Sequence, residues 1–205
     1  IAPWDYRYYA EKVRAARYDL DSNEVKQYLQ LDNLRQAMFY VAGELFGFDF
    51  RELPVGEVTV WNPAMRVFEV TDRESGENVG LWYLDPYARP GKQSGAWANS
   101  LRGHTTIDGE TNVLATNNSN FVEPSPGQPV LVSWDDATTF FHEFGHALHG
   151  LLSNVTYPMI SGTAVPRDFV EFPSQLFEHW LERPAILTQF VVHHATRAHI
   201  PAELL

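Results

Sequence analysis

The chain has 205 residues, enough to bury the core of one domain, and its hydrophobic fraction of 44% is that of a globular protein. It contains no cysteine, which excludes disulfides and thiolate metal sites, so any bound metal must take nitrogen and oxygen ligands. The net charge of −11 argues against nucleic acid and anionic membrane surfaces as partners, and no apolar run is long enough to span a bilayer.

The first part of the chain predicts helices. Residues 4–18 are rich in aromatic, charged and alanine residues and lack glycine and proline. Asp21 or Ser22 can cap a short helix that runs through Leu29. Residues 31–46 predict an amphipathic helix that Gly47 ends. Its apolar stripe consists of Leu31, Leu34, Met38, Val41, Leu45 and Phe46.

The middle of the chain predicts short strands. Runs rich in β-branched and aromatic residues lie at 57–61, 66–72, 79–84 and 111–117. The segment ESGE between the second and third runs predicts a hairpin. Glycine and proline mark residues 87–95 and 122–130 as loops.

The order of these elements predicts one α+β domain over residues 1–205, mostly helical, with a small antiparallel sheet. We divide it into helices at 1–50, the sheet and loops at 51–132, and further helices at 133–205.

The third part contains the segment FHEFGHALHG. Ser133 or Asp135 can cap a helix from about Trp134 to Leu152. On such a helix His142 and His146 stand one turn apart and point the same way, as two ligands of one metal ion must. The apolar face would consist of Ala137, Phe141, Phe144, Leu148 and Leu151.

Glu143 follows His142 and is offset from the metal axis, so it need not be a ligand. Zinc lowers the pKa of a bound water to about 7, and a nearby carboxylate can take the remaining proton. The spacing H-E-x-x-H supplies this arrangement. The alternative is that these are ordinary buried histidines on a core helix.

A further ligand is needed, and His149 is a poor one. Three ligands from two turns of a single helix fit tetrahedral geometry badly, so we interpret His149 as a packing or hydrogen-bonding residue. The carboxylates downstream are Asp168, Glu171, Glu178 and Glu182. Glu171 lies among apolar residues, where a carboxylate is costly unless it is paired or bound to a metal. Glu178, two helical turns on, suits a carboxylate that orients a zinc-bound imidazole, whereas Glu182 is typical of a solvated face.

The segments FHEFGHALHG, SGT, PRDFVEFPSQ and EHW together resemble the thimet oligopeptidase family of zinc metallopeptidases, which are gluzincins. The segments DPYARPGKQSGAWANS and SWDDATTFFHEFGH are most similar to the bacterial peptidyl-dipeptidase (dipeptidyl carboxypeptidase) branch, with oligopeptidase A as the alternative. The resemblance extends over essentially the whole chain.

The resemblance implies a zincin-like catalytic domain that binds one Zn²⁺ per chain. His142, His146 and Glu171 would be the metal ligands, Glu143 the general base and later proton donor, and Glu178 an outer carboxylate. The implied substrates are short peptides, and the full-length protein would be a monomer. The segment GAWAN at 95–99 is similar to an edge-strand motif that pairs with the substrate backbone in zinc aminopeptidases.

The resemblance also implies parts that we do not find in these residues. The family has a large N-terminal helical region and, after the zinc site, a segment rich in histidine and tyrosine that stabilises the tetrahedral intermediate. We therefore expect this chain to be the central catalytic section of a protein about three times longer, cut at both ends.

Three functions remain open from the sequence. They are release of C-terminal dipeptides, cleavage inside oligopeptides, and zinc binding with little turnover. Because the missing segment would hold the oxyanion donors, we expect slow catalysis by these residues alone; otherwise Tyr157 and His149 would be the first candidate donors. The lack of cysteine and of a signal-peptide pattern predicts a cytoplasmic protein, with the periplasm as the alternative.

Overall fold

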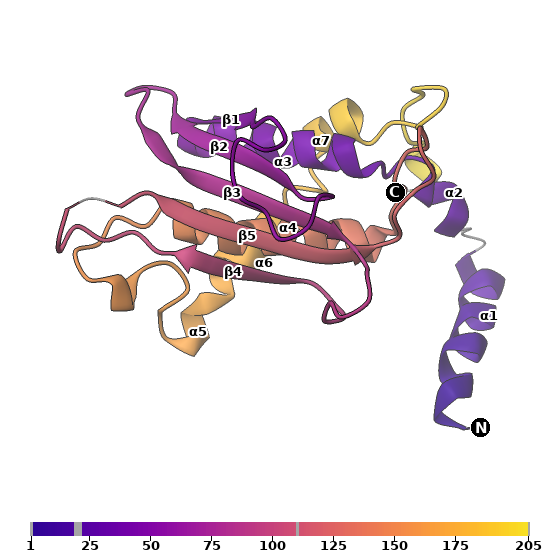
Figure 1. Ribbon diagram of the computed structural model, residues 1–205. Helices are drawn as coiled ribbons and strands as arrows, with labels where there is room; N and C mark the ends of the chain where they lie inside the picture. The colour runs from indigo at the N-terminus through magenta and orange to yellow at the C-terminus, as the bar shows by residue number, and fades with distance from the viewer. Residues whose placement is uncertain (1, 19–21, 110, 205) are drawn as a thin grey trace.

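The computed structural model describes residues 2–18, 22–109 and 111–204, and it has an α+β architecture (Figure 1). The helices before the sheet and those after it both lie where the sequence predicts helix. They are η1 (Pro3–Asp5), α1 (Tyr6–Tyr18), α2 (Ser22–Lys26) and α3 (Leu31–Phe46), followed after the sheet by α4 (Trp134–Leu151), η2 (Pro158–Ile160), α5 (Arg167–Val170), α6 (Phe172–Glu178), α7 (Pro184–Phe190) and η3 (Ala202–Leu204). Helical residues outnumber strand residues, but they are not the majority of the chain.

Within the described ranges, five strands form one sheet in the order β1-β2-β3-β5-β4. The strands are β1 (Phe48–Glu52), β2 (Arg66–Asp72), β3 (Asn78–Tyr87), β4 (Trp97–Arg102) and β5 (Val113–Phe121). The predicted hairpin is confirmed, since β2 and β3 pair antiparallel. The prediction of a purely antiparallel sheet is wrong: β3 and β5 run parallel, because the chain crosses to the far edge to form β4 before it returns as β5.

The predicted strand at 57–61 is also wrong. These residues form turns and bends, and Val58 and Val60 pack over a small cluster on the outer face of the sheet. That cluster consists of Leu53, Met65, Val67 and Tyr83. The apolar residues of this segment therefore cover the sheet instead of extending it. The pattern also missed β1, which starts directly after the helix-ending Gly47, and β4, for which only the similarity of residues 95–99 to an edge-strand motif gave an indication.

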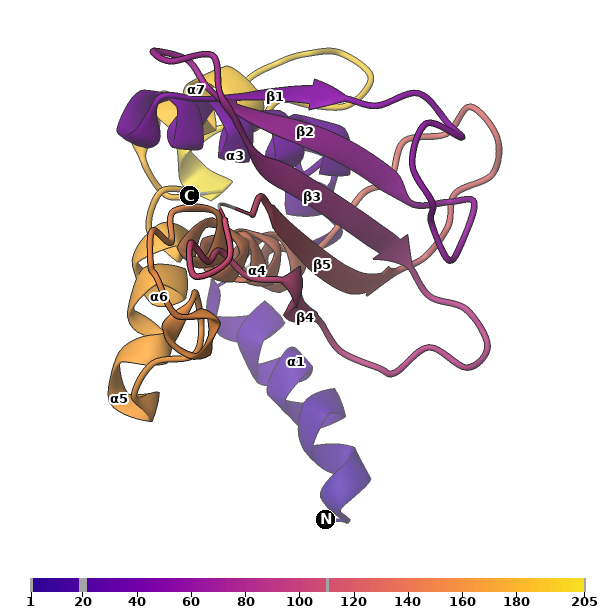
Figure 2. The same cartoon turned by 60° about the vertical axis from the view of Figure 1, so that its left-hand side comes forward.

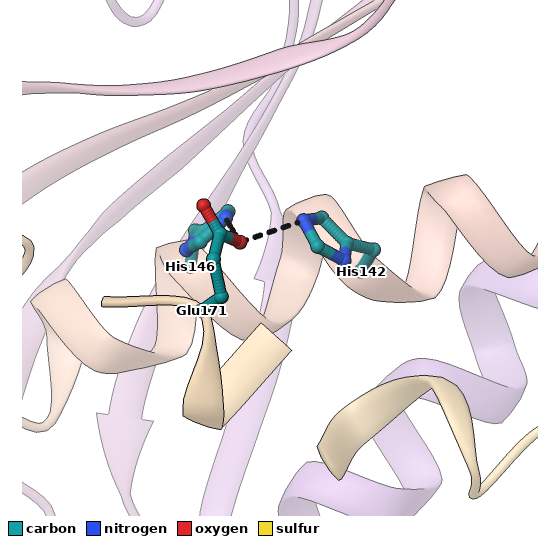
Figure 3. A group of neighbouring side chains, drawn as sticks. All are labelled: His142, His146 and Glu171. Atoms are coloured by element: carbon teal, nitrogen blue, oxygen red, sulfur yellow. Dashed lines mark ion pairs between the residues drawn. The ribbon is translucent and has the colours of Figure 1, made fainter. Parts of the chain in front are cut away.

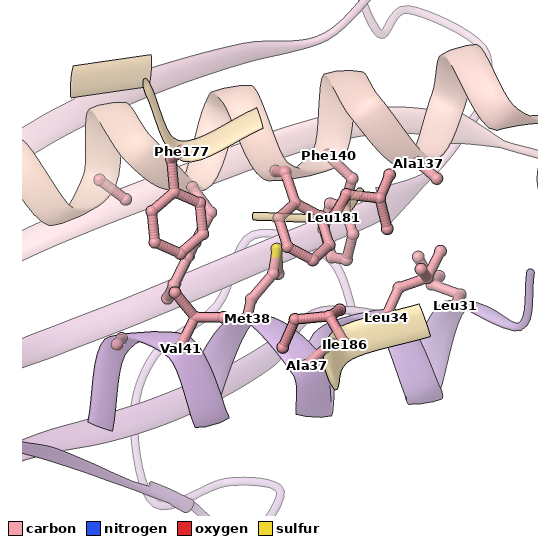
Figure 4. Packing of buried hydrophobic residues seen from close by; sticks show 14 of the residues in the cluster. Leu31, Leu34, Ala37, Met38, Val41, Ala137, Phe140, Phe177, Leu181 and Ile186 are labelled. Carbon is pink, nitrogen blue, oxygen red and sulfur yellow. The ribbon is translucent and has the colours of Figure 1, made fainter. Parts of the chain in front are cut away.

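The main core lies between the inner face of the sheet and the helices α3 and α4 (Figures 1 and 2). Alternation along the strands directs Phe68, Trp82 and Val113 inward, where α3 contributes Leu34, Met38 and neighbouring residues. Figure 4 shows Phe140 of α4, Phe177 of α6 and Ile186 facing the apolar stripe of α3. Burial of these side chains fixes α4 against the sheet.

Gly47 adopts the left-handed conformation and ends α3, as predicted. Leu45 and Phe46 differ from the prediction, because they are 44% and 37% exposed instead of completing the buried stripe. At the N-terminal side, α1 extends away from the sheet in both views (Figures 1 and 2). Ser22 begins α2, which ends at Lys26, and the other proposed cap, Asp21, lies outside the described residues.

No helix among the described residues combines the length and the hydropathy that a bilayer span requires.

Candidate metal centre

The helix α4 carries three of the predicted site residues, and its N-terminus is fixed by a capping box. The hydroxyl of Ser133 accepts a hydrogen bond from the Asp136 backbone N–H, and the Asp136 carboxylate accepts one from the Ser133 backbone N–H. Of the two predicted caps, the structure therefore selects Ser133. All residues of the predicted apolar face are buried against the core, which sets the rotation of α4 and turns its histidines away from the core.

The structure brings His142, His146 and Glu171 together (Figure 3). The Nε2 atoms of both histidines lie 3.2 Å from the same carboxylate oxygen, Oε2 of Glu171. The side chains of the histidines are 24% and 12% exposed, so the cluster borders solvent on one side. Two residues of α4 and one from the α5–α6 junction thus converge on one point.

This donor set fits a zinc ion. Ligand atoms placed 2.0–2.1 Å from a tetrahedral zinc are separated from each other by about 3.3–3.4 Å, close to the observed separations between nitrogen and oxygen. Two imidazoles and one carboxylate are also the ligands of a catalytic site that leaves a fourth position open.

Glu178 contacts the opposite edge of the His142 ring. Its Oε1 lies 2.5 Å from Nδ1 of His142, whereas Glu171 faces Nε2. The contact fixes the ring orientation and leaves Nε2 as the nitrogen available to a metal. The Nδ1 of His146 is buried and makes no hydrogen bond with the described residues.

Close packing of α4 on α6 brings the two glutamates to the histidines. A Cβ atom at Gly145 would lie 2.7 Å from the Cα of Ser174 and 3.0 Å from the carbonyl oxygen of Pro173, so only glycine fits there. The helix is interrupted between α5 and α6 at Glu171, and the Ser174 hydroxyl donates to the Glu171 carboxylate. Glu171 and Glu178 therefore do not share one continuous helical face, yet both reach His142.

Glu143 lies beside the cluster without belonging to it. The residue is 8% exposed. Burial raises the pKa of the Glu143 carboxyl above its ordinary value, and the nearby Glu171 carboxylate acts in the same direction, whereas His142 and the backbone N–H of Ala98 on β4 offset part of the effect. Burial likewise lowers the pKa of His146, which favours the neutral ring that a metal ligand requires.

Other candidate residues lie outside the metal-binding group. His149 packs edge-on against Phe169, with the ring centroids 6.0 Å apart, and burial lowers its pKa. Asp168 and Glu182 are exposed. The prediction of an apolar, buried setting for Glu171 is wrong, because its side chain is 50% exposed. What holds the carboxylate in place is the pair of histidines and Ser174.

Asn117 was not among the predicted site residues, although it contacts the backbone of the predicted base. Its side-chain Nδ2 donates to the carbonyl oxygen of Glu143 at 2.6 Å. A signal was present in the sequence, because TNNSN at 116–120 is a polar run inside an otherwise strand-like segment.

Comparisons with known proteins identify the family of the chain. The model of peptidase family M3 matches residues 1–205. The chain is 41% identical over 203 residues to dipeptidyl carboxypeptidase of Escherichia coli (strain K12), an alignment that covers 98% of this chain and 29% of the relative. The Salmonella typhimurium dipeptidyl carboxypeptidase is 40% identical over 205 residues, covering 100% of this chain and 30% of the relative. Oligopeptidase A of E. coli is 36% identical over 208 residues, with 100% and 30% coverage.

The chain thus spans about 30% of the length of these relatives. The resemblance inferred from the motifs is confirmed by the family match over all 205 residues. The chain belongs to peptidase family M3.

Proposed function

We propose that the chain carries the zinc centre of a peptidase that hydrolyses short peptides and releases C-terminal dipeptides. The observation that carries the proposal is the placement of one Glu171 oxygen 3.2 Å from the Nε2 atoms of both His142 and His146, with Glu143 adjacent on α4. The family match over the whole chain supports the same reaction class.

His142, His146 and Glu171 would hold the zinc ion, which when bound supplies a Lewis acid that polarises the scissile carbonyl and acidifies a water molecule. Glu143 accepts the proton from the attacking water at its carboxylate and returns it to the leaving amine. Glu178 keeps the His142 ring in the orientation that directs Nε2 toward the zinc position.

The edge strand β4 would hold the substrate. It pairs with β5 along one side and ends the sheet order among the described residues, so its other side can accept an extended peptide. Ala98 on this strand contacts Glu143, which places a paired peptide next to the base. This arrangement supports the edge-strand role predicted for residues 95–99, of which β4 contains 97–99.

Product analysis on a matched peptide pair tests the specificity. The zinc-loaded protein is incubated with a short peptide that has a free C-terminal carboxylate and, in a separate reaction, with the same peptide carrying a C-terminal amide. Mass spectrometry identifies the products. We expect a C-terminal dipeptide from the free peptide and little cleavage of the amide. Equal internal cleavage of both peptides would instead support the oligopeptidase reading, which the similarity to oligopeptidase A also suggests.

Zinc binding is measured separately, because it distinguishes a zinc site with slow catalysis from an incorrect assignment of the zinc ligands. Elemental analysis after reconstitution should find about one zinc per chain, and Glu171→Ala should lose it, whereas exposed Asp168→Ala should not. One zinc without peptide hydrolysis would favour the zinc-binding alternative. The cytoplasmic location and the monomeric state of a full-length protein remain predictions.

A further inference from the structure

The strand β5 contains a run of buried polar residues that the fold alone does not require. Thr116, Asn117, Asn118 and Ser119 are each no more than 4% exposed. Asparagine is disfavoured in strands, and a buried amide is costly unless it is hydrogen-bonded. Their neighbours on the strand, Val113 and Ala115, show that this position in the sheet accepts apolar residues.

Asn117 points toward α4 and uses both ends of its amide. Its Oδ1 accepts a hydrogen bond from the Trp82 indole at 2.6 Å, and its Nδ2 donates to the Glu143 carbonyl at 2.6 Å. Trp82 is fully buried and Asn117 is 1% exposed. The indole therefore holds the amide in the one orientation in which its NH₂ group faces α4.

The same sheet position lies next to the edge strand β4. Asn117 is the direct cross-strand partner of Ala98 on β4. Asn117 donates to the Glu143 carbonyl, and α4 also contacts β4. The hydrogen bond from Asn117 therefore fixes α4 at the point where it passes the edge strand.

We propose that Asn117 is a positioning residue, which ties the backbone of Glu143 to the sheet so that the Glu143 carboxylate keeps its place beside the edge strand β4. This role rests on the proposed function of Glu143 as the base. A displacement of about 1 Å at a reacting group can reduce the rate about 100-fold. The buried hydrogen bond from Asn117 to the Glu143 carbonyl therefore affects catalysis through the position of Glu143.

Asn118 indicates that the polar run serves β4 as well. Its Nδ2 donates to the Trp97 carbonyl at 3.3 Å and to the Thr116 hydroxyl at 3.1 Å. The alternating side chains of β5 thus contact α4 through Asn117 and the start of β4 through Asn118.

The test compares Asn117→Leu, which removes both hydrogen bonds, with Trp82→Phe, which removes the indole donor and keeps the bond from Asn117 to Glu143. The control is Val67→Ala on the outer face of the sheet, which lowers stability away from α4. In the full chain loaded with zinc, we expect kcat to fall about 10–100-fold in Asn117→Leu relative to the control. KM and the zinc content per folded chain should stay unchanged, and Trp82→Phe should show a smaller loss in kcat.

Amide hydrogen exchange in the turn of α4 that contains Glu143 provides a readout that needs no activity. Protection of these amides should fall most in Asn117→Leu, fall less in Trp82→Phe and be retained in Val67→Ala. Retained protection in both Asn117→Leu and Trp82→Phe would overturn the proposal, as would kcat values equal to that of the control. If Asn117→Leu does not fold, Trp82→Phe decides the outcome. If the wild-type chain hydrolyses no peptide, the proposed function fails while the exchange measurement still decides whether Asn117 positions Glu143.

Discussion

The imidazole of His142 is held between two carboxylates: Oε1 of Glu178 lies 2.5 Å from Nδ1, and Oε2 of Glu171 lies 3.2 Å from Nε2. The two contacts differ in what they do for the ring. Nδ1 donates its proton to Glu178, which leaves Nε2 with a free lone pair directed at the same point as Nε2 of His146. His146 has no equivalent partner among the described residues, so Glu178 orients only one of the two rings.

Removing Glu178 should therefore weaken metal binding without removing a ligand. We expect Glu178→Ala to reduce zinc affinity about 10–100-fold, the usual effect of losing an outer hydrogen bond to a metal-bound histidine. Competition with a chromogenic chelator measures the change. Glu182→Ala is the matched control, because Glu182 lies four residues further on and is exposed. Equal affinities for the two variants would rule out an orienting role for Glu178.

Substitution of Glu143 should abolish most catalysis and leave metal binding intact. The Glu143→Gln substitution preserves the size of the side chain and removes the proton acceptor, and Glu143 is outside the ligand group. We expect zinc content to stay at about one per chain while peptide hydrolysis falls by about 10²–10⁴, the usual contribution of a general base. Elemental analysis measures the zinc content, and a peptide assay on the same sample measures the rate of hydrolysis. Loss of zinc from this variant would instead make Glu143 a ligand.

Gly145 should be required for the contact between α4 and α6. A methyl group there would meet the backbone of Ser174 and Pro173, which cannot move aside as a flexible side chain can. We expect Gly145→Ala to destabilise the fold by about 1–3 kcal/mol and to weaken zinc binding, because α6 must shift together with Glu171 and Glu178.

Gly150 on the same helix provides the control for Gly145. An added Cβ at Gly150 would meet only Val113, at 3.8 Å, so Gly150→Ala should be neutral or stabilising by up to about 1 kcal/mol. Urea unfolding and zinc titration of both variants measure the effects. A Gly145→Ala variant as stable as Gly150→Ala would contradict the close packing of the two helices.

The sequence predicts the helix α4 well because its determinants are local. The cap at Ser133, the apolar periodicity and the four-residue spacing of His142 and His146 all lie within one element, and the structure places them as expected. The partner carboxylates are harder to predict. The α5–α6 break at Glu171 and the 50% exposure of this side chain do not follow from its apolar neighbours in the sequence, although those neighbours, together with the family resemblance, favoured Glu171 over Asp168.

The sheet shows where local patterns are insufficient. Alternation identifies β2, β3 and most of β5, but it does not state which strands pair, so the parallel pairing of β3 with β5 was not predicted. The run at 57–61 has the composition of a strand, yet Val58 and Val60 cover the outer face of the sheet. Asn117 was missed for the same reason, since its partners Trp82 and Glu143 are distant in sequence.

The loop between β3 and β4 is anchored by a buried carboxylate. Asp85 has a side chain 2% exposed, and it pairs with Arg89 at 2.6 Å and with the equally buried Lys92 at 3.0 Å. Trp61 is the third residue that donates a hydrogen bond to this carboxylate. Burial alone would raise the pKa of Asp85, but the hydrogen bonds from Arg89, Lys92 and Trp61 outweigh it and leave the pKa below its ordinary value.

Loss of this carboxylate should destabilise the chain strongly, because Lys92 would remain buried without its partner. We expect Asp85→Asn to lower the free energy of unfolding by about 3–5 kcal/mol at neutral pH. The control Glu69→Gln removes the more exposed cross-strand pair with Arg51 and should lower it by about 0–1 kcal/mol. Since the folded pKa of Asp85 is depressed, its contribution is complete above the unfolded pKa of about 4 and is lost as the pH falls through the folded value. Urea unfolding at pH 7 and pH 3 measures the difference in the free energy of unfolding between wild type and Asp85→Asn. We expect this difference to be smaller at pH 3. A difference that stays constant or grows would show that the charged carboxylate of Asp85 does not stabilise the fold.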